Sequence, residues 1–143
     1  MGFNAKTEYG LVALLELVAV FPSSGILQVS QIASQQNIPD RYLEQMMISL
    51  RKAGILRSIR GPRGGYQLNR SPSEIALAEV INCLEGDIIS ANSPTSNTPE
   101  HRAVAGLQAN LDRRREDFLE SMTLQQLADQ RDQYLECRSM YFI

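Results

Sequence analysis

The residues best suited to chemistry lie between positions 39 and 68, in PDRYLEQMMISLRKAGILRSIRGPRGGYQL. At helical spacing, one side of this stretch carries almost only hydrogen-bonding groups: Arg41, Glu44, Gln45, Ile48, Ser49 and Lys52. The other side is apolar: Leu43, Met46, Met47, Leu50 and Ala53. Asp40 is a candidate N-cap, and Gly54 is placed to end the helix in a left-handed conformation. Arg, Gln, Glu and Ser side chains on one helix face can read base edges in the major groove of DNA.

A basic, glycine-rich hairpin follows this helix. Apolar and polar residues alternate from 55 to 59, with Ile55, Arg57 and Ile59 against Leu56 and Ser58, and residues 66–68 form the returning strand. Three glycines and a proline allow a tight turn, and two arginines lie on its tip: Arg60, Gly61, Pro62, Arg63, Gly64 and Gly65. Such a tip can reach phosphates or the minor groove.

Together these features predict a winged helix-turn-helix, in a fold that is mainly α with a small β-hairpin. The alternative is a solvent-facing helix followed by an ordinary hairpin, because charged helix faces usually only face water. The RGPRGGY turn favours DNA binding over that alternative. The candidate DNA-binding residues are Lys6, Gln28, Ser30, Arg41, Tyr42, Glu44, Gln45, Arg51, Arg60, Gly61, Pro62 and Arg63.

Charge is divided unevenly along the chain, although the net charge is only −2. Residues 1–70 contain 8 Lys and Arg against 4 Asp and Glu, and residues 71–143 contain 6 against 12. The basic half therefore coincides with the predicted DNA-reading elements. A low overall charge also predicts weak non-specific binding and dependence on specific contacts.

Three apolar patterns predict the helices that position these elements. Residues 5–21 are largely apolar and predict a first buried helix. A membrane span is not expected, because Glu16 interrupts the apolar run and the run is shorter than the roughly 20 residues that a span needs. No small-residue cleavage site follows, so this helix is not a signal peptide. Residues 29–37 form the first helix of the helix-turn-helix, where Gln28 and Ser30 can donate to phosphate. Ser71 and Pro72 open a helix that ends at Gly86.

The second half predicts a linker and two more helices. Residues 89–99 are rich in Ser, Asn, Thr and Pro and read as a flexible loop. The following helix carries an apolar stripe that can pack on its own domain or, as we favour, on a partner helix: Val104, Leu107, Leu111 and Phe118. Thr123 and Gln126 form a capping box for a last short helix. The predicted organisation is residues 1–85 as the DNA-binding domain, 86–99 as a flexible loop, 100–122 as a dimerisation helix and 123–143 as a C-terminal helix and tail.

The chain has two cysteines and one histidine, and these residues suggest no catalytic site. Paired carboxylates and a phosphate-binding loop are missing as well, so the sequence does not predict an enzyme. Cys83 lies on an apolar helix face and is expected to be a buried, inert thiol, whereas Cys137 lies in the tail and is expected to be more reactive. A thiol redox switch using both remains an alternative. So few cysteines indicate a reducing, cytoplasmic setting.

RYLEQ, LRKAGIL and SIRGPRGGYQL resemble the signature of the Rrf-two family of bacterial winged-helix transcription regulators. The resemblance runs from Phe3 to the C-terminus. It implies a homodimer that binds two operator half-sites, acting here as a repressor, with Glu44 contacting bases, Arg60 entering the minor groove and Lys6 contacting the DNA backbone. Arg41 replaces a Ser found in some members, and Glu8 replaces a basic residue, so the base preference can differ.

The chain departs from the family at its cofactor site. The resemblance implies that members with an iron–sulfur cluster hold it with three loop cysteines and a further ligand. In this chain the corresponding loop, residues 86–99, contains no cysteine, and Thr98 stands where the last of the three cysteines is expected. The histidine of the family ligand position, His101, cannot hold a cluster alone. We therefore expect no cofactor and interpret His101 as a residue of a helix start. A cluster bound by Cys83 and Cys137 would need unusual geometry.

The tail gives two alternatives. Its last four residues, Met140, Tyr141, Phe142 and Ile143, resemble the end of the cysteine-metabolism repressor branch of the family. That resemblance implies binding of cysteine synthase, whose active site accepts peptides ending in Ile. Without the family resemblance, the residues alone favour a tail that packs back on the dimer.

Overall fold

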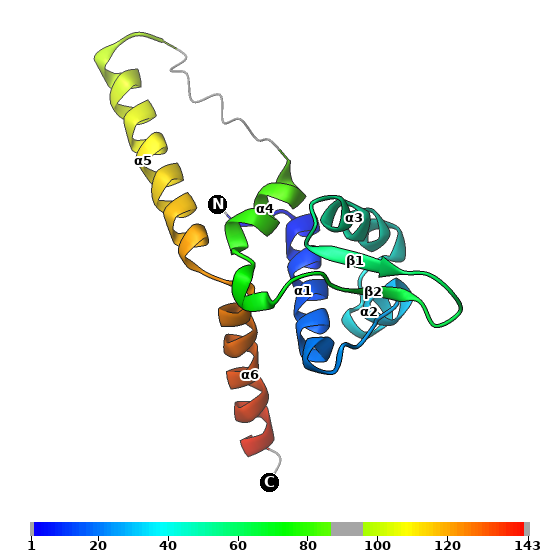
Figure 1. The fold of residues 1–143 in the computed structure, drawn as a ribbon. Helices are drawn as coiled ribbons and strands as arrows, with labels where there is room; N and C mark the ends of the chain where they lie inside the picture. Colours follow the sequence, from blue (N-terminus) through cyan, green and yellow to red (C-terminus); the bar gives the residue numbers. More distant parts are fainter. Residues whose placement is uncertain (1, 87–95, 142–143) are drawn as a thin grey trace.

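The computed structural model describes residues 2–86 and 96–141. The elements follow in the order α1 (Ala5–Val20), η1 (Phe21–Ser23), α2 (Val29–Gln36), α3 (Asp40–Lys52), β1 (Leu56–Ile59), β2 (Gly65–Leu68), η2 (Pro72–Glu74), α4 (Leu77–Glu85), α5 (Pro99–Ser121) and α6 (Leu124–Tyr141). The first eight gather into one body, from which α5 and α6 extend in opposite directions (Figure 1). The mainly helical fold with one small hairpin is the one predicted.

Helix α1 is the centre of the body. Asn4 caps it, with its Oδ1 accepting from the Thr7 backbone N–H at 2.8 Å. Leu14 and Leu17 are fully buried, and α1 packs against α2, α3, α4, α6 and β2. The sequence prediction of a buried first helix is confirmed, and the surrounding elements are held in place by this one helix.

Helices α2 and α3 form the helix-turn-helix. Asn37 ends α2 at a φ of 55°, and the turn through Ile38 leads into α3. The prediction that Asp40 caps α3 is wrong by one residue: Pro39 is the N-cap, and Asp40 is the first helical residue. Its carboxylate still lies near the positive end of the helix dipole. Gly54 has a φ of 80° and ends the helix as predicted.

The buried face of α3 agrees with the predicted stripe except at its end. Four predicted residues are buried: Leu43, Met46, Met47 and Leu50. Ala53, the fifth, is exposed because α3 ends at Lys52 and Ala53 is its C-cap. The core therefore holds α3 by its two central turns.

The wing is an antiparallel pair with Leu56 opposite Leu68 and Ile59 opposite Gly65. Its burial does not alternate as predicted. Ile55 precedes the strand, and both Ile55 and Leu56 are buried, whereas Arg57 and Ser58 are exposed. The reason is that only the base of the hairpin lies on the core. There Leu27 adds a further bridge, with N–H···O distances of 3.0 and 2.8 Å to and from Tyr66.

Gly64 allows the wing turn to close. Its N–H donates to the Gly61 carbonyl at 2.9 Å, and a Cβ at this position would overlap the Ile59 carbonyl oxygen. We predict that Gly64→Ala lowers the free energy of unfolding by about 1–3 kcal/mol. Urea unfolding measures this change. Gly106→Ala, in open space on the exposed side of α5, is the control and is expected to raise stability by about 0.5–1 kcal/mol. Equal stability of Gly64→Ala and the parent chain would contradict the account.

The segment after the wing differs from the predicted single helix. It is divided into η2 and α4, because Ile75 is extended, with φ −103° and ψ 111°. Its carbonyl accepts from the Leu124 N–H at 2.8 Å, and the Leu77 N–H donates to the Met122 carbonyl at 2.9 Å. This pairing attaches the junction between α5 and α6 to the body.

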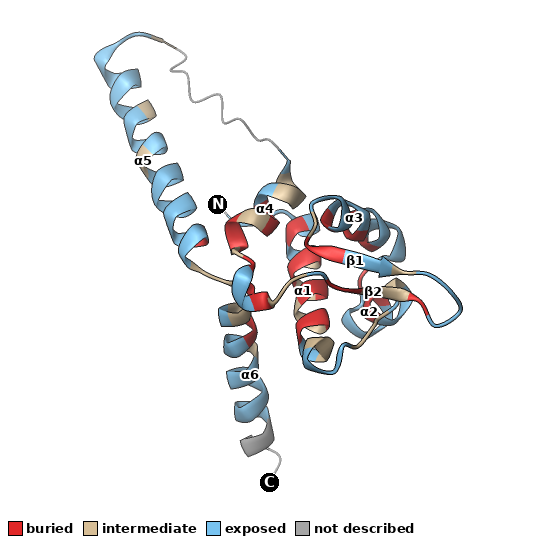
Figure 2. Ribbon diagram, viewed as in Figure 1, coloured by how far each residue is buried: buried red, intermediate tan, exposed pale blue. Residues whose placement is uncertain are grey.

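Of the two C-terminal helices, α5 (Pro99–Ser121) agrees with the predicted 100–122 to within one residue at each end, whereas α6 is longer than predicted. Thr123 and Gln126 form the predicted capping box, with bonds of 2.9 and 3.2 Å, but α6 has 18 residues instead of being short. Leu124 and Ala128 pack it on the core, and most of its remaining length is exposed (Figure 2). Most of the predicted flexible loop, residues 87–95, lies outside the described residues. Its last predicted residue, Pro99, is the first residue of α5. No helix among the described residues is long and apolar enough to cross a membrane.

Candidate nucleic-acid interface

The exposed face of α3 carries the predicted polar residues together. Exposed side chains line it from end to end: Arg41, Tyr42, Glu44, Gln45, Ile48, Ser49, Arg51 and Lys52. Glu44 and Arg41 form no ion pair or side-chain hydrogen bond within the described ranges, 2–86 and 96–141. Their hydrogen-bonding groups are therefore free to meet a ligand, which is the arrangement that base recognition needs.

The wing is anchored at its base and free at its tip. Arg57 donates through Nε to the Oε1 of Gln67, which is 7% exposed and donates in turn to the Ser24 carbonyl at 3.2 Å. Beyond this anchor the four tip residues are exposed: Arg60, Gly61, Pro62 and Arg63. Gly61 has a φ of 109°, which few residues other than glycine adopt. The hairpin projects from the body beside α2 and α3 (Figure 1).

A cleft joins the start of α1 to the start of α3. It is lined by Asn4, Ala5, Lys6, Tyr9, Pro39 and Tyr42. The structure therefore brings Lys6 next to the first turn of α3, although the two are far apart in the sequence. Asn4, the cap of this end of α1, was not among the predicted residues, but an Asn three positions before Thr7 at a helix start is a recognisable capping signal.

The predicted contacts at the start of α2 are accessible. Gln28 and Ser30 are exposed. The Gln28 backbone N–H donates to Gln31 Oε1 at 2.9 Å, so this N–H already has a partner, whereas the Ser30 hydroxyl forms no hydrogen bond with other described residues. Ser30 is thus better placed than the Gln28 backbone to donate to a phosphate.

The cysteines lie on different helices. Cys83 on α4 is half-buried instead of buried, and its thiol donates to the Ser49 carbonyl at 3.4 Å. Burial raises the pKa of the Cys83 thiol, and the carboxylate of Glu79 raises that pKa further. A raised pKa lowers the thiolate fraction, so Cys83 is a weaker nucleophile than an ordinary cysteine. Cys137 is exposed on α6.

His101 lies in the first turn of α5. Thr98 caps this helix, with its Oγ1 accepting from the His101 backbone N–H at 3.3 Å and lying 2.7 Å from His101 Nδ1. This is the position predicted for His101 at a helix start. In the parts of the chain that the structure describes, no three His, Cys, Asp or Glu side chains gather as metal ligands do.

The predicted dimerisation stripe of α5 is exposed. Val104 and Leu107 are 56% and 60% exposed, and Leu111 and Phe118 are 43% and 60% exposed. Only Leu119 of this helix is buried. The stripe is thus an apolar surface that the body does not cover.

A helix-turn-helix with an exposed polar face, followed by an arginine-tipped hairpin, defines the winged-helix class of DNA-binding proteins. The chain belongs to the Rrf2 family of this class: the family model, described as an iron-dependent transcriptional regulator, matches residues 3–130. Its members are helix-turn-helix transcription regulators, so DNA binding in transcription regulation is the role of this family.

Individual relatives agree with this assignment. The predicted HTH-type transcriptional regulator slr0846 of Synechocystis sp. is 46% identical over 85 residues, which are 59% of this chain and 57% of that protein. The regulator CymR of Bacillus subtilis is 33% identical over 99% of both chains. Among solved structures, IscR of T. potens superposes with a TM-score of 0.74 at 30% identity, covering 91% of this chain and 88% of that one.

Proposed function

We propose that this chain is a non-enzymatic, sequence-specific repressor that binds a DNA operator of two half-sites as a homodimer in the cytoplasm. The observation that carries the proposal is the exposed polar face of α3 together with the exposed arginines of the wing. In this proposal Glu44 and Gln45 read base edges, and Arg60 enters the minor groove. Lys6, Ser30 and Arg63 contact phosphates, which fix the register on the duplex.

The exposed stripe of α5 supports the homodimer. Two α5 helices related by a two-fold axis would cover each other's apolar residues, because a two-fold interface uses the same surface on both subunits. Two copies of α3 would then face one side of the complex, as two half-sites require. We therefore propose that residues 1–85 bind DNA, that residues 100–122 form the dimer contact, and that the segment from residue 123 forms a helix against α1.

We also propose that the chain does not hold the cysteine-ligated cluster of its family. The described residues present do not fit one, since no three His, Cys, Asp or Glu side chains gather there, the Cys83 thiol donates to the Ser49 carbonyl and His101 is engaged with Thr98. The remaining thiol, that of Cys137, lies on α6. A cluster needs several thiolates on one site.

Iron and acid-labile sulfide assays, with an absorption spectrum, on protein purified without oxygen test this proposal. The expected result is a colourless protein with no stoichiometric iron. A coloured species that holds stoichiometric iron, and that Cys83→Ala or Cys137→Ala removes, would contradict it and favour a cluster or redox sensor.

A second candidate function concerns cysteine supply. CymR, 33% identical over nearly the whole chain, is described as the global cysteine regulator of B. subtilis. The tail residues Met140 and Tyr141 lie in the last turn of α6, whereas Phe142 and Ile143 lie outside the described residues. If the tail binds cysteine synthase, calorimetry will detect binding to the full chain and none after removal of residues 140–143. Equal binding by both would reject the tail as the contact.

A further inference from the structure

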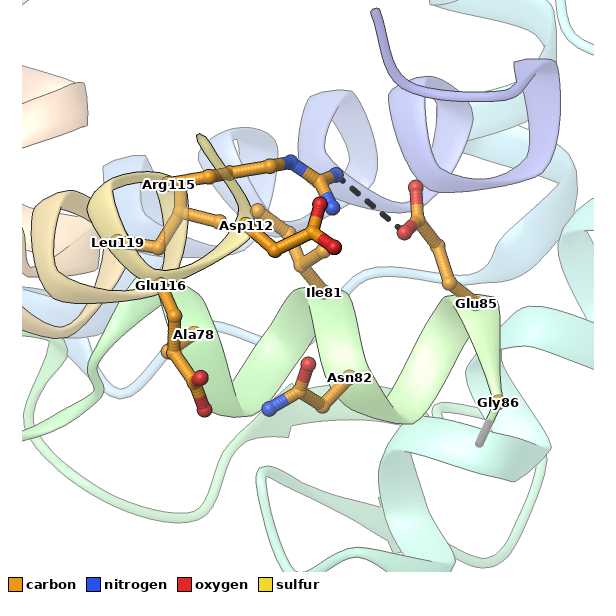
Figure 3. Close-up of a pocket in the computed structure, with 9 residues that line it drawn as sticks. All are labelled: Ala78, Ile81, Asn82, Glu85, Gly86, Asp112, Arg115, Glu116 and Leu119. Carbon is orange, nitrogen blue, oxygen red and sulfur yellow. Dashed lines mark hydrogen bonds and ion pairs between the residues drawn. The ribbon is translucent and has the colours of Figure 1, made fainter. Parts of the chain in front are cut away.

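A single carboxylate connects three elements at the end of α4. Glu85 is the last residue of this helix, and its side chain is only 12% exposed. Its Oε1 accepts from the Thr7 hydroxyl at 3.3 Å, and its Oε2 lies 3.4 Å from Arg115 Nη2. Figure 3 shows Arg115 reaching from α5 toward Glu85 across the rim of a pocket between α4 and α5. Each oxygen of Glu85 thus has a different helix as its partner.

The Thr7 contact fixes the DNA-facing end of α1. Thr7 is fully buried in the first turn, and its backbone N–H is held by Asn4. Lys6, the preceding residue, lines the cleft shared with Tyr42 of α3. A shift of this turn would therefore move the ammonium of Lys6 relative to the recognition helix.

The Arg115 contact belongs to the helix that carries the apolar stripe. Arg115 lies four residues after Leu111 and three before Phe118. Its guanidinium also stacks on the Phe3 ring, 5.8 Å from the centroid, so α5 is attached to the N-terminal segment at a second point. Arg114, the residue before it on the helix, is exposed and forms no ion pair with any described residue.

We propose that Glu85 is a positioning residue for DNA binding, which couples the placement of α5 to the turn of α1 that carries Lys6. The inference rests on the proposed function and adds its regulation: a change in the placement of α5 alters phosphate contact by Lys6 through Glu85 and Thr7. Because the carboxylate is largely shielded from water, losing either partner leaves it poorly satisfied instead of merely solvated.

The test measures binding of a fluorescein-labelled duplex, selected from a random library by the unchanged protein, with dimer dissociation followed by sedimentation. Thr7→Val keeps the side-chain shape but loses the hydroxyl, and Arg115→Gln loses the charge. Each is expected to weaken DNA binding about 3- to 10-fold without changing dimer dissociation. Thr7→Ser, which retains the hydroxyl, is expected to restore most of the affinity. Arg114→Gln removes the same charge one residue away and is expected to have no effect.

A cycle with Lys6→Ala separates positioning from general damage to the fold. If Thr7 acts through Lys6, Thr7→Val will cost less than twofold in affinity once Lys6 is absent. Full additivity of the two changes, or wild-type affinity of both Thr7→Val and Arg115→Gln, would overturn the inference while leaving the proposed function intact. Failure of the unchanged protein to select any duplex would instead defeat the proposed function, and this inference with it.

Discussion

Replacing Leu107 and Leu111 with glutamate is expected to convert the proposed dimer to monomers and to weaken binding of a two-half-site operator by more than about a hundredfold. Both side chains lie on the exposed stripe of α5, which the body leaves uncovered. Burying two carboxylates against the apolar stripe of a partner helix would cost several kcal/mol, because both would lose hydration. A monomer would then keep only one half-site's contacts.

Sedimentation equilibrium and DNA titration measure the two effects on the same samples. Ala109→Glu adds a negative charge at an exposed position on the opposite side of α5. It is the control for adding a carboxylate to this helix. It is expected to leave the dimer intact. If the double variant remains a dimer, α5 is not the dimerisation helix.

Replacing Glu44 and Arg60 together with alanine is expected to abolish sequence-specific binding while the dimer and any complex through the tail remain. Each residue is expected to contribute about 1–3 kcal/mol if it contacts a base edge, so the pair would lower affinity by about 30-fold to 10,000-fold or more. Neither side chain forms an ion pair with the rest of the described chain, so their removal leaves no buried group unsatisfied.

The two single variants can be told apart by their salt dependence. If Arg60 contacts only phosphate, Arg60→Ala will mainly reduce the slope of affinity against salt by about one ion, whereas Glu44→Ala will relax preference at particular bases. Arg102→Ala, at an exposed position on α5, is the control for loss of a positive charge. Full sequence-specific binding by Arg60→Ala would show that the tip of the wing does not contact DNA through Arg60.

The sequence predicted best those elements whose signals are local. Helix α3 was readable from its apolar stripe and from Gly54, and the start of α6 was readable from Thr123 and Gln126. The break in the helix at Ile75 could not be predicted from the sequence. Its cause is the pairing of Ile75 with Leu124 and of Leu77 with Met122, nearly fifty residues away along the chain. The length of α6 was missed because residues 129–138, which extend it beyond Ala128, are mostly polar and exposed, so no apolar stripe marks their helix.

The candidate interface divides in the same way. The polar face of α3 and the arginine tip were visible in the sequence, and the structure exposes both, on a helix and a hairpin whose first strand contacts that helix. The connection of Glu85 to Thr7 and Arg115 was not visible, because it joins residues 78 and 30 positions apart and no local pattern marks them. The roles of the candidate DNA-binding residues remain predictions.

Selection of duplexes from a random library, followed by footprinting and stoichiometry on the enriched sequence, tests the central claim most directly. The account predicts an enriched inverted repeat whose two half-sites are protected about one helical turn apart, with two chains bound per duplex. Enrichment of no sequence, or binding of one chain to a single asymmetric site, would contradict it.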